Sequence, residues 1–208
     1  MRKYVLVTLI VILFVILSVS QIQSQIKAEE NEKIIKNKQK VIDIEQTQPV
    51  NPDILKVQYI TNWDLEIAEY FVNEANSRGV KIFEECLPII AIETGHTYRF
   101  DLIHYNKNRT TDQGLFQIND ILYSTLVKSL KAEGREFDSW NRLNPEFNIS
   151  AGMYWLGYLK SNHQLEGHRL FSSYNRGISG AKYYASRHGS YETEYSRKVY
   201  VVRSSYRM

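Results

Sequence analysis

Beyond residue 60, apolar and polar residues follow each other with the three- and four-residue spacing of amphipathic helices. Residues 64–78 show this spacing clearly, and Gly79 directly after them is a typical helix end. The same spacing predicts helices over residues 82–94, 121–133, 148–160, 168–175, 177–187 and 191–206. Pro88 must lie in the first turn of its helix or kink it. The pattern predicts a mainly α-helical domain over residues 61–208.

One connection between these helices is long and polar. It runs from Gly95 to Gln113 and includes Asn106-Lys107-Asn108-Arg109. Loops of this length inside a compact domain usually have a function. We expect a short hairpin or loop here, at the edge of a groove.

The amino end has a different character. Met1-Arg2-Lys3 precedes an apolar run over residues 4–19, and no further charge occurs before Lys27. The run is long for a cleaved signal and short for a membrane span. We expect residues 1–20 to be a retained single-pass anchor that places the helical domain outside the cytoplasm, with secretion after cleavage as the alternative. Residues 21–60 are polar, with few large apolar side chains, and predict a stalk or linker.

Glu93 closes the apolar run Leu87-Pro88-Ile89-Ile90-Ala91-Ile92. Ile90, Ile89 and Cys86 precede it by three, four and seven residues, so the carboxyl shares the helix stripe that should face the core. Burial would raise its pKa, and a general acid that works near neutral pH needs a raised pKa. The alternative is a glutamate at a helix end that turns out to water.

Four segments occur in a recognisable order along the chain. They are Glu93-Thr94-Gly95, Gly114-Leu115-Phe116-Gln117-Ile118-Asn119, the stretch from Asn148 to Leu156, and Ser173-Tyr174-Asn175-Arg176-Gly177. Together they resemble the catalytic domain of the soluble lytic transglycosylases, within the lysozyme-like superfamily. The resemblance covers about residues 62 to 202 and implies a lysozyme-like helical fold with a hairpin or loop at the groove.

The resemblance also implies roles for individual residues. Glu93 would be the single acid/base, Gln117 and Asn175 would line a sugar groove, and Tyr174 would contact the catalytic carboxyl. Thr94 stands where these enzymes usually have serine and keeps its hydroxyl.

Three further positions lie in the same segments. Phe116 replaces a methionine and keeps an apolar wall against a sugar face. Asn148 has a structural role rather than a catalytic one, and Gly152 on the same helix face would admit a neighbouring helix.

Asp112 opens a second mechanism, because Thr111-Asp112-Gln113-Gly114 also resembles the Thr-Asp-x-Gly stretch that bears the second carboxylate of animal-type lysozymes. A muramidase would use Glu93 and Asp112 together. A lytic transglycosylase needs only Glu93, and would cleave the β-1,4 bond between N-acetylmuramic acid and N-acetylglucosamine to leave 1,6-anhydromuramyl ends. Asp112 would then tighten the loop before Gly114.

Composition narrows the list of partners. The five histidines are scattered and Cys86 is the single cysteine, so we expect no metal, no cofactor and no internal disulfide. The net charge is only +3. We expect peptidoglycan glycan strands and the membrane as partners, no nucleic acid, and a monomer. Tyr183, Tyr184, Tyr191 and Tyr195 cluster late in the chain and could stack on sugar rings. A membrane-anchored binding protein without turnover is the remaining alternative.

Overall fold

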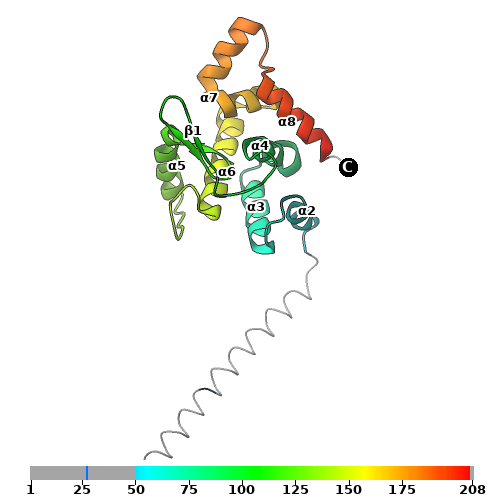
Figure 1. The fold of residues 1–208 in the computed structure, drawn as a ribbon, viewed down its shortest axis with the longest axis vertical. Helices are drawn as coiled ribbons and strands as arrows, with labels where there is room; N and C mark the ends of the chain where they lie inside the picture. The colour runs from blue at the N-terminus through cyan, green and yellow to red at the C-terminus, as the bar shows by residue number, and fades with distance from the viewer. Residues whose placement is uncertain (1–26, 28–49, 207–208) are drawn as a thin grey trace, which may run out of the picture. The chain divides into compact units, whose positions relative to one another are not determined.

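The computed structural model describes residue 27 and residues 50–206. The compact unit that begins at Pro52 is mainly helical with one small sheet. Figure 1 shows α6 in the middle, with α5 and the sheet on one side and α3 and α4 on the other. This confirms the predicted mainly helical fold and is consistent with a lysozyme-like domain. The elements are α2 Pro52–Thr61, α3 Leu65–Ser77, the π-helix η1 Ile82–Cys86, α4 Leu87–Glu93, β1 Ile103–Tyr105, β2 Thr111–Gln113, β3 Ile118–Asn119, α5 Asp120–Ala132, α6 Pro145–His163, α7 Gly167–His188 and α8 Glu194–Ser205.

Helix α2 is the first element of the compact unit. Its residues Ile54 and Val57 are buried, and the helix packs against α3. The predicted linker over residues 21–60 therefore overlaps this helix, because two apolar side chains three residues apart are enough to dock one helical turn. The rest of that linker and the predicted anchor over residues 1–20 lie outside the described residues, apart from residue 27 and residues 50–51.

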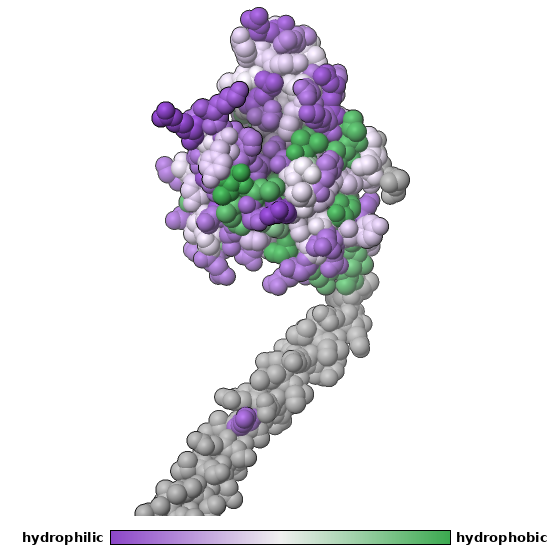
Figure 2. Space-filling model, viewed as in Figure 1, coloured by the Kyte–Doolittle hydropathy of each residue, from purple (hydrophilic) through white to green (hydrophobic). Residues whose placement is uncertain are grey.

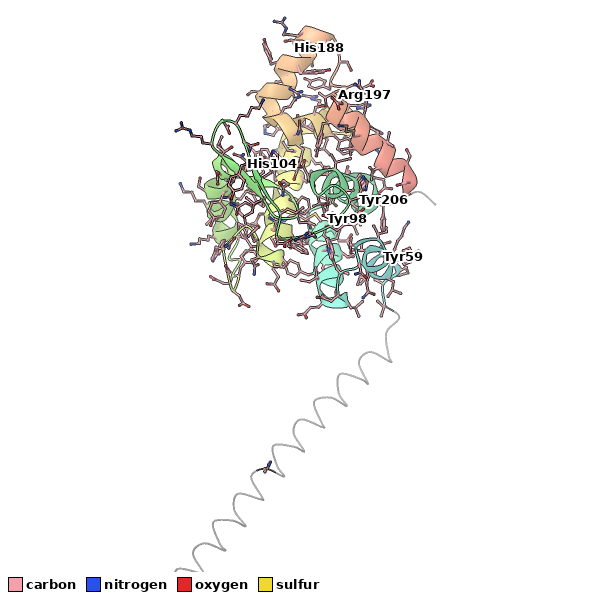
Figure 3. All side chains as sticks on the ribbon, in the orientation of Figure 1. Tyr59, Tyr98, His104, His188, Arg197 and Tyr206 are labelled. Atoms are coloured by element: carbon pink, nitrogen blue, oxygen red, sulfur yellow. The ribbon has the colours of Figure 1, made fainter. Side chains whose placement is uncertain are left out.

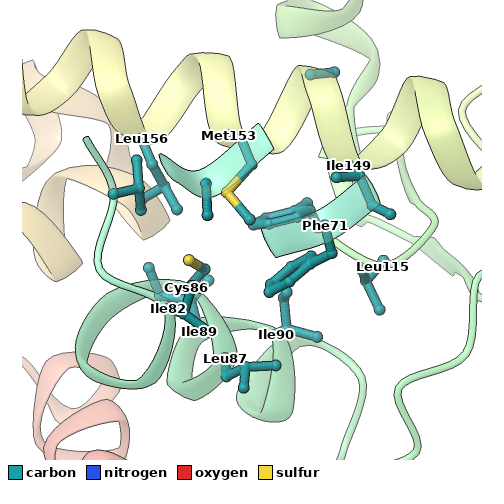
Figure 4. Close-up of a cluster of buried hydrophobic side chains, with 14 of the residues drawn as sticks. Phe71, Ile82, Cys86, Leu87, Ile89, Ile90, Leu115, Ile149, Met153 and Leu156 are labelled. Carbon is teal, nitrogen blue, oxygen red and sulfur yellow. The ribbon is translucent and has the colours of Figure 1, made fainter. Parts of the chain in front are cut away.

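Helix α4 lies at the centre of the core. Its residues from Leu87 to Ala91 are buried. Figure 4 shows Ile89 and Ile90 between α4 and a layer that includes Phe71 of α3 and Met153 of α6, and Leu87 on another side of α4. A short helix that is apolar on all sides must be covered on all sides. The core thus fixes the position of the last residue of α4, which is Glu93.

The turn before α4 differs from the predicted continuous helix over residues 82–94. Residues 82–86 form a π-helix, in which the Cys86 and Leu87 N–H groups donate to the carbonyls of Lys81 and Ile82, five residues back. Pro88 has no N–H, and its ring would press on the carbonyl four residues earlier in a regular α-helix. The wider π turn relieves that contact, and Pro88 lies in the first turn of α4 as predicted.

The long polar connection contains the predicted hairpin, extended by a third strand. β1 and β2 pair antiparallel with His104 opposite Asp112, and β2 and β3 pair antiparallel with Asp112 opposite Asn119. The sheet order is β1-β2-β3. Asp112 therefore lies on the central strand of a small sheet beside the end of α4.

The last three helices begin and end at clear sequence signals. α6 starts at Pro145 rather than at the predicted residue 148, because the Asn144 side chain caps it by accepting from the Phe147 N–H at 2.9 Å. α7 contains both helices predicted over residues 168–187, joined at Gly177, whose φ of 69° and ψ of 163° are not helical. α8 begins after Thr193, which forms a capping box with Ser196.

The surface in the view of Figure 1 is mostly hydrophilic, with separate hydrophobic patches (Figure 2). Among the residues that the structure describes, no helix combines the length and the apolar character needed to cross a membrane.

Candidate functional site

Glu93 ends α4 between two adjoining hollows. The inner hollow, about 130 Å³, is lined by six of the seven predicted site residues: Glu93, Asp112, Phe116, Gln117, Tyr174 and Asn175. The outer hollow, about 340 Å³, is lined by Thr94 and His104 and shares Glu93, Asp112 and Gln117 with the inner one. Residues from four separate segments thus meet around one carboxyl group.

The environment of Glu93 favours a protonated carboxyl. Burial raises its pKa from 4.5 to about 7, the nearby charge of Asp112 adds to the increase, and the hydrogen bond from Tyr195 opposes it. Because desolvation penalises the charged form, the side chain keeps its proton up to near-neutral pH. This carboxyl therefore has the protonation behaviour of a general acid.

Two tyrosines lie beside the carboxyl, and their roles differ from the prediction. Tyr174 was expected to contact the carboxyl, but the hydrogen bond to it comes from Tyr195, whose hydroxyl donates to Glu93 Oε1 at 2.6 Å. Tyr174 donates instead to the carbonyl of Phe116 at 2.6 Å. The reason is that α8 packs along α4 and brings Tyr195 to the carboxyl. Burial raises the pKa of both phenols well above the usual value, so both remain hydrogen-bond donors.

Asp112 faces both hollows but is held firmly by the sheet. Its Oδ1 accepts from Asn119 Nδ2 at 2.6 Å, and its Oδ2 accepts from Asn106 Nδ2 at 2.8 Å. Asn106 lies in the hairpin turn and Asn119 on the neighbouring strand, so the carboxylate ties three parts of the sheet together. Both oxygens already accept from fixed amides, which is the loop-tightening role considered for Asp112.

Thr94 lines the outer hollow, and Gln117 lines both hollows. The Thr94 hydroxyl donates to the Ile90 carbonyl at 2.8 Å and accepts from the Tyr98 N–H at 3.1 Å. Its hydrogen bonds are therefore made to the backbone. The Gln117 side-chain nitrogen donates to the Gly114 carbonyl at 2.7 Å, which holds this amide at the shared wall of the two hollows.

Phe116 forms the floor of the inner hollow rather than an exposed wall. Its side chain is only 1% exposed. Its ring lies over Gly152, where an added Cβ would come within 2.1 Å of a ring carbon. Gly152 therefore admits this ring, and not a neighbouring helix as the spacing suggested. A larger side chain on α6 would push the floor into the hollow.

Asn148 has a structural role, as expected, although the N-cap of α6 is Asn144. It is fully buried, and its side chain accepts from the Phe116 N–H at 2.9 Å and donates to the carbonyls of Gln113 and Arg142 at 3.1 and 2.6 Å. The turn before Phe116 also requires glycine, because Gly114 has a φ of +75° and its position is crowded by the Asn148 amide. These contacts fix the segment that carries Phe116 and Gln117.

Asn175 and Trp155 also line the inner hollow. Asn175 is exposed and lies two residues before the break at Gly177, which redirects α7 past the hollow. Trp155, on α6, also lines this hollow. The sequence offered a signal for it, since it lies in the third of the four recognised segments, but no role was assigned to it.

His104 marks the other edge of the site. It lies on β1, is exposed, and lines the outer hollow, and Figure 3 shows it on the hairpin. The tyrosine cluster is divided: Tyr195 turns inward to Glu93, whereas Tyr184 stacks on His188 at 4.2 Å between ring centroids. Of these two tyrosines, Tyr195 is the one that contacts the carboxyl of Glu93.

A comparison with protein families found a match for part of this domain. Residues 101–196 match the family described as the transglycosylase SLT domain, which confirms the resemblance. The matched range includes Asp112, Gln117, Tyr174 and Asn175, and Glu93 lies just before it. Among curated proteins, none matches the chain.

Proposed function

We propose that this chain, which carries a transglycosylase SLT domain, is a lytic transglycosylase that cleaves peptidoglycan with Glu93 as its sole acid/base. The scissile bond is the β-1,4 bond between N-acetylmuramic acid and N-acetylglucosamine. The observation that carries this proposal is the carboxyl of Glu93, with a pKa raised to about 7, at the junction of two hollows. Glycosidic cleavage first needs a protonated acid beside the bond that breaks, and Glu93 lines both hollows.

The reaction begins with proton transfer from Glu93 to the glycosidic oxygen. The bond between that oxygen and C1 of the muramic acid breaks, and the N-acetylglucosamine leaves as an alcohol. The positive charge that develops at C1 is shielded by the substrate's own N-acetyl group. The C6 hydroxyl of the muramic acid then attacks C1 while Glu93, now ionised, takes its proton. A 1,6-anhydro ring forms, no water is consumed, and Glu93 returns to its protonated state.

The neighbouring residues hold this acid and the substrate in place. The Tyr195 hydroxyl, 2.6 Å from Oε1, fixes the rotamer of Glu93 and stabilises the ionised form that exists between the two proton transfers. Gln117 and Asn175 supply amides to the sugar hydroxyl and acetamido groups. Phe116 excludes water from the base of the inner hollow, which maintains the raised pKa of Glu93.

The geometry of Asp112 supports one carboxylate rather than two. A nucleophilic carboxylate must present an oxygen to C1, and both oxygens of Asp112 accept from side-chain amides at 2.6 and 2.8 Å. Its charge still reaches Glu93 and raises the pKa of that group. The second candidate function, a lysozyme-type muramidase that uses Glu93 and Asp112, is favoured by the presence of Asp112 on the wall of both hollows.

The proposed location follows from the amino-terminal sequence. Residues 1–20 would anchor the chain in the membrane, and the SLT domain would work outside the cytoplasm, where peptidoglycan lies. Secretion after cleavage of residues 1–20 is the alternative route to the same compartment.

Two measurements test the proposal. A gel that contains peptidoglycan should clear around the wild type and remain intact around Glu93→Gln; equal clearing by both, or none by the wild type, would overturn the enzymatic assignment in favour of a non-catalytic binding protein. Mass spectrometry of the released fragments separates the chemistries, because anhydro ends lack one water relative to reducing ends. An Asp112→Asn variant with anhydro products and substantial activity would exclude the muramidase mechanism.

A further inference from the structure

A third hollow lies on the side of α6 reached from the ends of α3 and α5. It has a volume of about 350 Å³ and is lined by Ser77 and Arg78 at the end of α3, Glu133 after α5, and Tyr154, Tyr158 and Asn162 on α6. We call it the α6 hollow. None of these residues takes part in the chemistry proposed for Glu93, so the hollow has no role in that reaction.

The α6 hollow is connected to the inner hollow by a pair of stacked rings. Tyr158 stacks on Trp155 with ring centroids 5.5 Å apart and an interplanar angle of 15°. Trp155 lines the inner hollow and Tyr158 lines the α6 hollow. Residues three apart lie on one helix face, so a continuous aromatic stripe runs along α6 from one hollow to the other. Both rings are partly exposed.

The charges in the α6 hollow cancel each other. The Arg78 guanidinium donates to both oxygens of Glu133, at 2.8 and 2.5 Å, and also to Glu74 at 3.3 Å. A bidentate pair of this kind leaves no net positive charge to recruit a phosphate or a carboxylate. It does offer fixed donors and acceptors side by side, which suits a ligand with many hydroxyl groups.

The remaining lining completes the same chemistry. The Tyr154 ring lies against the Arg78 guanidinium, 5.2 Å from ring centroid to carbon, which holds this ring in place. Ser77, Ser161 and Asn162 are exposed polar residues at the rim. Aromatic faces pack against the C–H face of a pyranose, and polar rims bind its hydroxyl groups.

We propose that the α6 hollow is a second saccharide-binding site that takes an uncharged N-acetylhexosamine ring. The identity of the polymer, peptidoglycan, rests on the proposed function. The ring would belong to the glycan strand that is cleaved or to a neighbouring strand. It would be bound at a distance from the bond that is cleaved beside Glu93. Its binding would keep the domain on insoluble wall material between cleavage events.

The test measures binding without turnover. The full chain carrying Glu93→Gln is sedimented with peptidoglycan sacculi and compared with the same chain carrying Tyr158→Ala in addition. Loss of one ring contact worth about 0.5–1.5 kcal/mol corresponds to about a two- to tenfold weaker apparent Kd. Tyr59→Ala is the matched control, because Tyr59 is 89% exposed on α2 and lies outside the hollow. It should bind as the parent does.

Two further variants separate loss of binding from loss of fold. Tyr158→Phe keeps the ring and should retain binding. Asn162→Leu alters the exposed rim without touching the core and should weaken binding with an unchanged unfolding midpoint. If Tyr158→Ala and Asn162→Leu both bind sacculi like the parent, the site does not exist.

Soluble probes identify the class of ligand. An uncharged N-acetylglucosamine tetramer should compete for sacculus binding by the parent and lose that effect in Tyr158→Ala, whereas inorganic phosphate should not compete. Competition by phosphate alone would overturn the assignment to a neutral sugar.

A cleavage assay separates this site from the proposed function. On a soluble glycan too short to reach both hollows, the chain that keeps Glu93 and carries only Tyr158→Ala should cleave like the wild type. A wild type that binds but does not cleave would refute the proposed function and leave the binding site standing.

Discussion

The raised pKa of Glu93 makes a quantitative prediction about stability. The unfolded chain exposes this carboxyl at its ordinary pKa of 4.5, whereas the folded protein holds it at about 7. The two values differ by about 2.5 pH units, and one pH unit is worth about 1.36 kcal/mol, so the ionised carboxyl destabilises the folded state by about 3 kcal/mol. Glu93→Gln removes this destabilisation, because the amide does not ionise, and keeps a side-chain oxygen that can accept from Tyr195.

The sign follows from proton binding. Between pH 4.5 and about 7 the folded state holds more protons than the unfolded state, so the free energy of unfolding of the wild type falls as the pH rises. The contribution of Glu93 is fully present below pH 4.5 and is lost as the pH passes through about 7. Glu93→Gln should match the wild type at low pH and exceed its free energy of unfolding by about 3 kcal/mol above neutrality.

The assay is urea unfolding of both proteins at a series of pH values from about 4 to 9, which spans both pKa values. Glu69→Gln, an exposed glutamate on α3, controls for the loss of one formal charge and should stay within about 0.5 kcal/mol of the wild type throughout. A difference between wild type and Glu93→Gln that is constant with pH would refute the claim that burial holds the proton on this carboxyl.

Three other variants test the surroundings of the acid. Tyr195→Phe removes the hydrogen bond that lowers the pKa of Glu93, so the alkaline limb of the pH–rate profile should move to higher pH while kcat falls; an unmoved limb would contradict the contact. Gly152→Ala should destabilise by about 1–3 kcal/mol in thermal or urea unfolding because its Cβ meets a ring carbon at 2.1 Å, whereas Gly157→Ala on the same helix meets its nearest atom at 3.3 Å and should cost less. Asn148→Asp turns a carboxylate toward two carbonyls and should lower the free energy of unfolding by at least about 2 kcal/mol, more at pH 8 than at pH 4.

The parts of the site that depend on local sequence were predictable. The spacing of Cys86, Ile89 and Ile90 before Glu93 predicted a carboxyl on the core side of a helix, and all three of these apolar side chains are fully buried. Helical periodicity depends only on neighbours within two turns. For the same reason the hairpin, whose polar turn lies between two short extended segments, could be placed before its strands were known.

Contacts between distant segments were not predictable in the same way. Tyr195 follows Glu93 by 102 residues, and its hydrogen bond exists because α8 packs along α4. Nothing in the residues around Tyr195 distinguishes it from Tyr191 or Tyr184. The glycine at position 152 signalled a close approach, but the spacing on one helix cannot say whether a helix or a ring fills the space.

The acid also depends on α8 for a reason that a family match alone does not reveal. Tyr195, in the first turn of α8, donates a hydrogen bond to Glu93. Tyr206 follows α8 directly, and its hydroxyl is hydrogen-bonded to the hydroxyl of Tyr98; Figure 3 shows these two residues close together. The Tyr98 N–H in turn donates to the hydroxyl of Thr94. One helix thus holds the segment from Glu93 to Tyr98 at both of its ends. Glu93 and Tyr98 precede the matched residues 101–196, Tyr206 follows them and Tyr195 lies within them, so the position of the acid depends on contacts between the matched segment and residues on both sides of it.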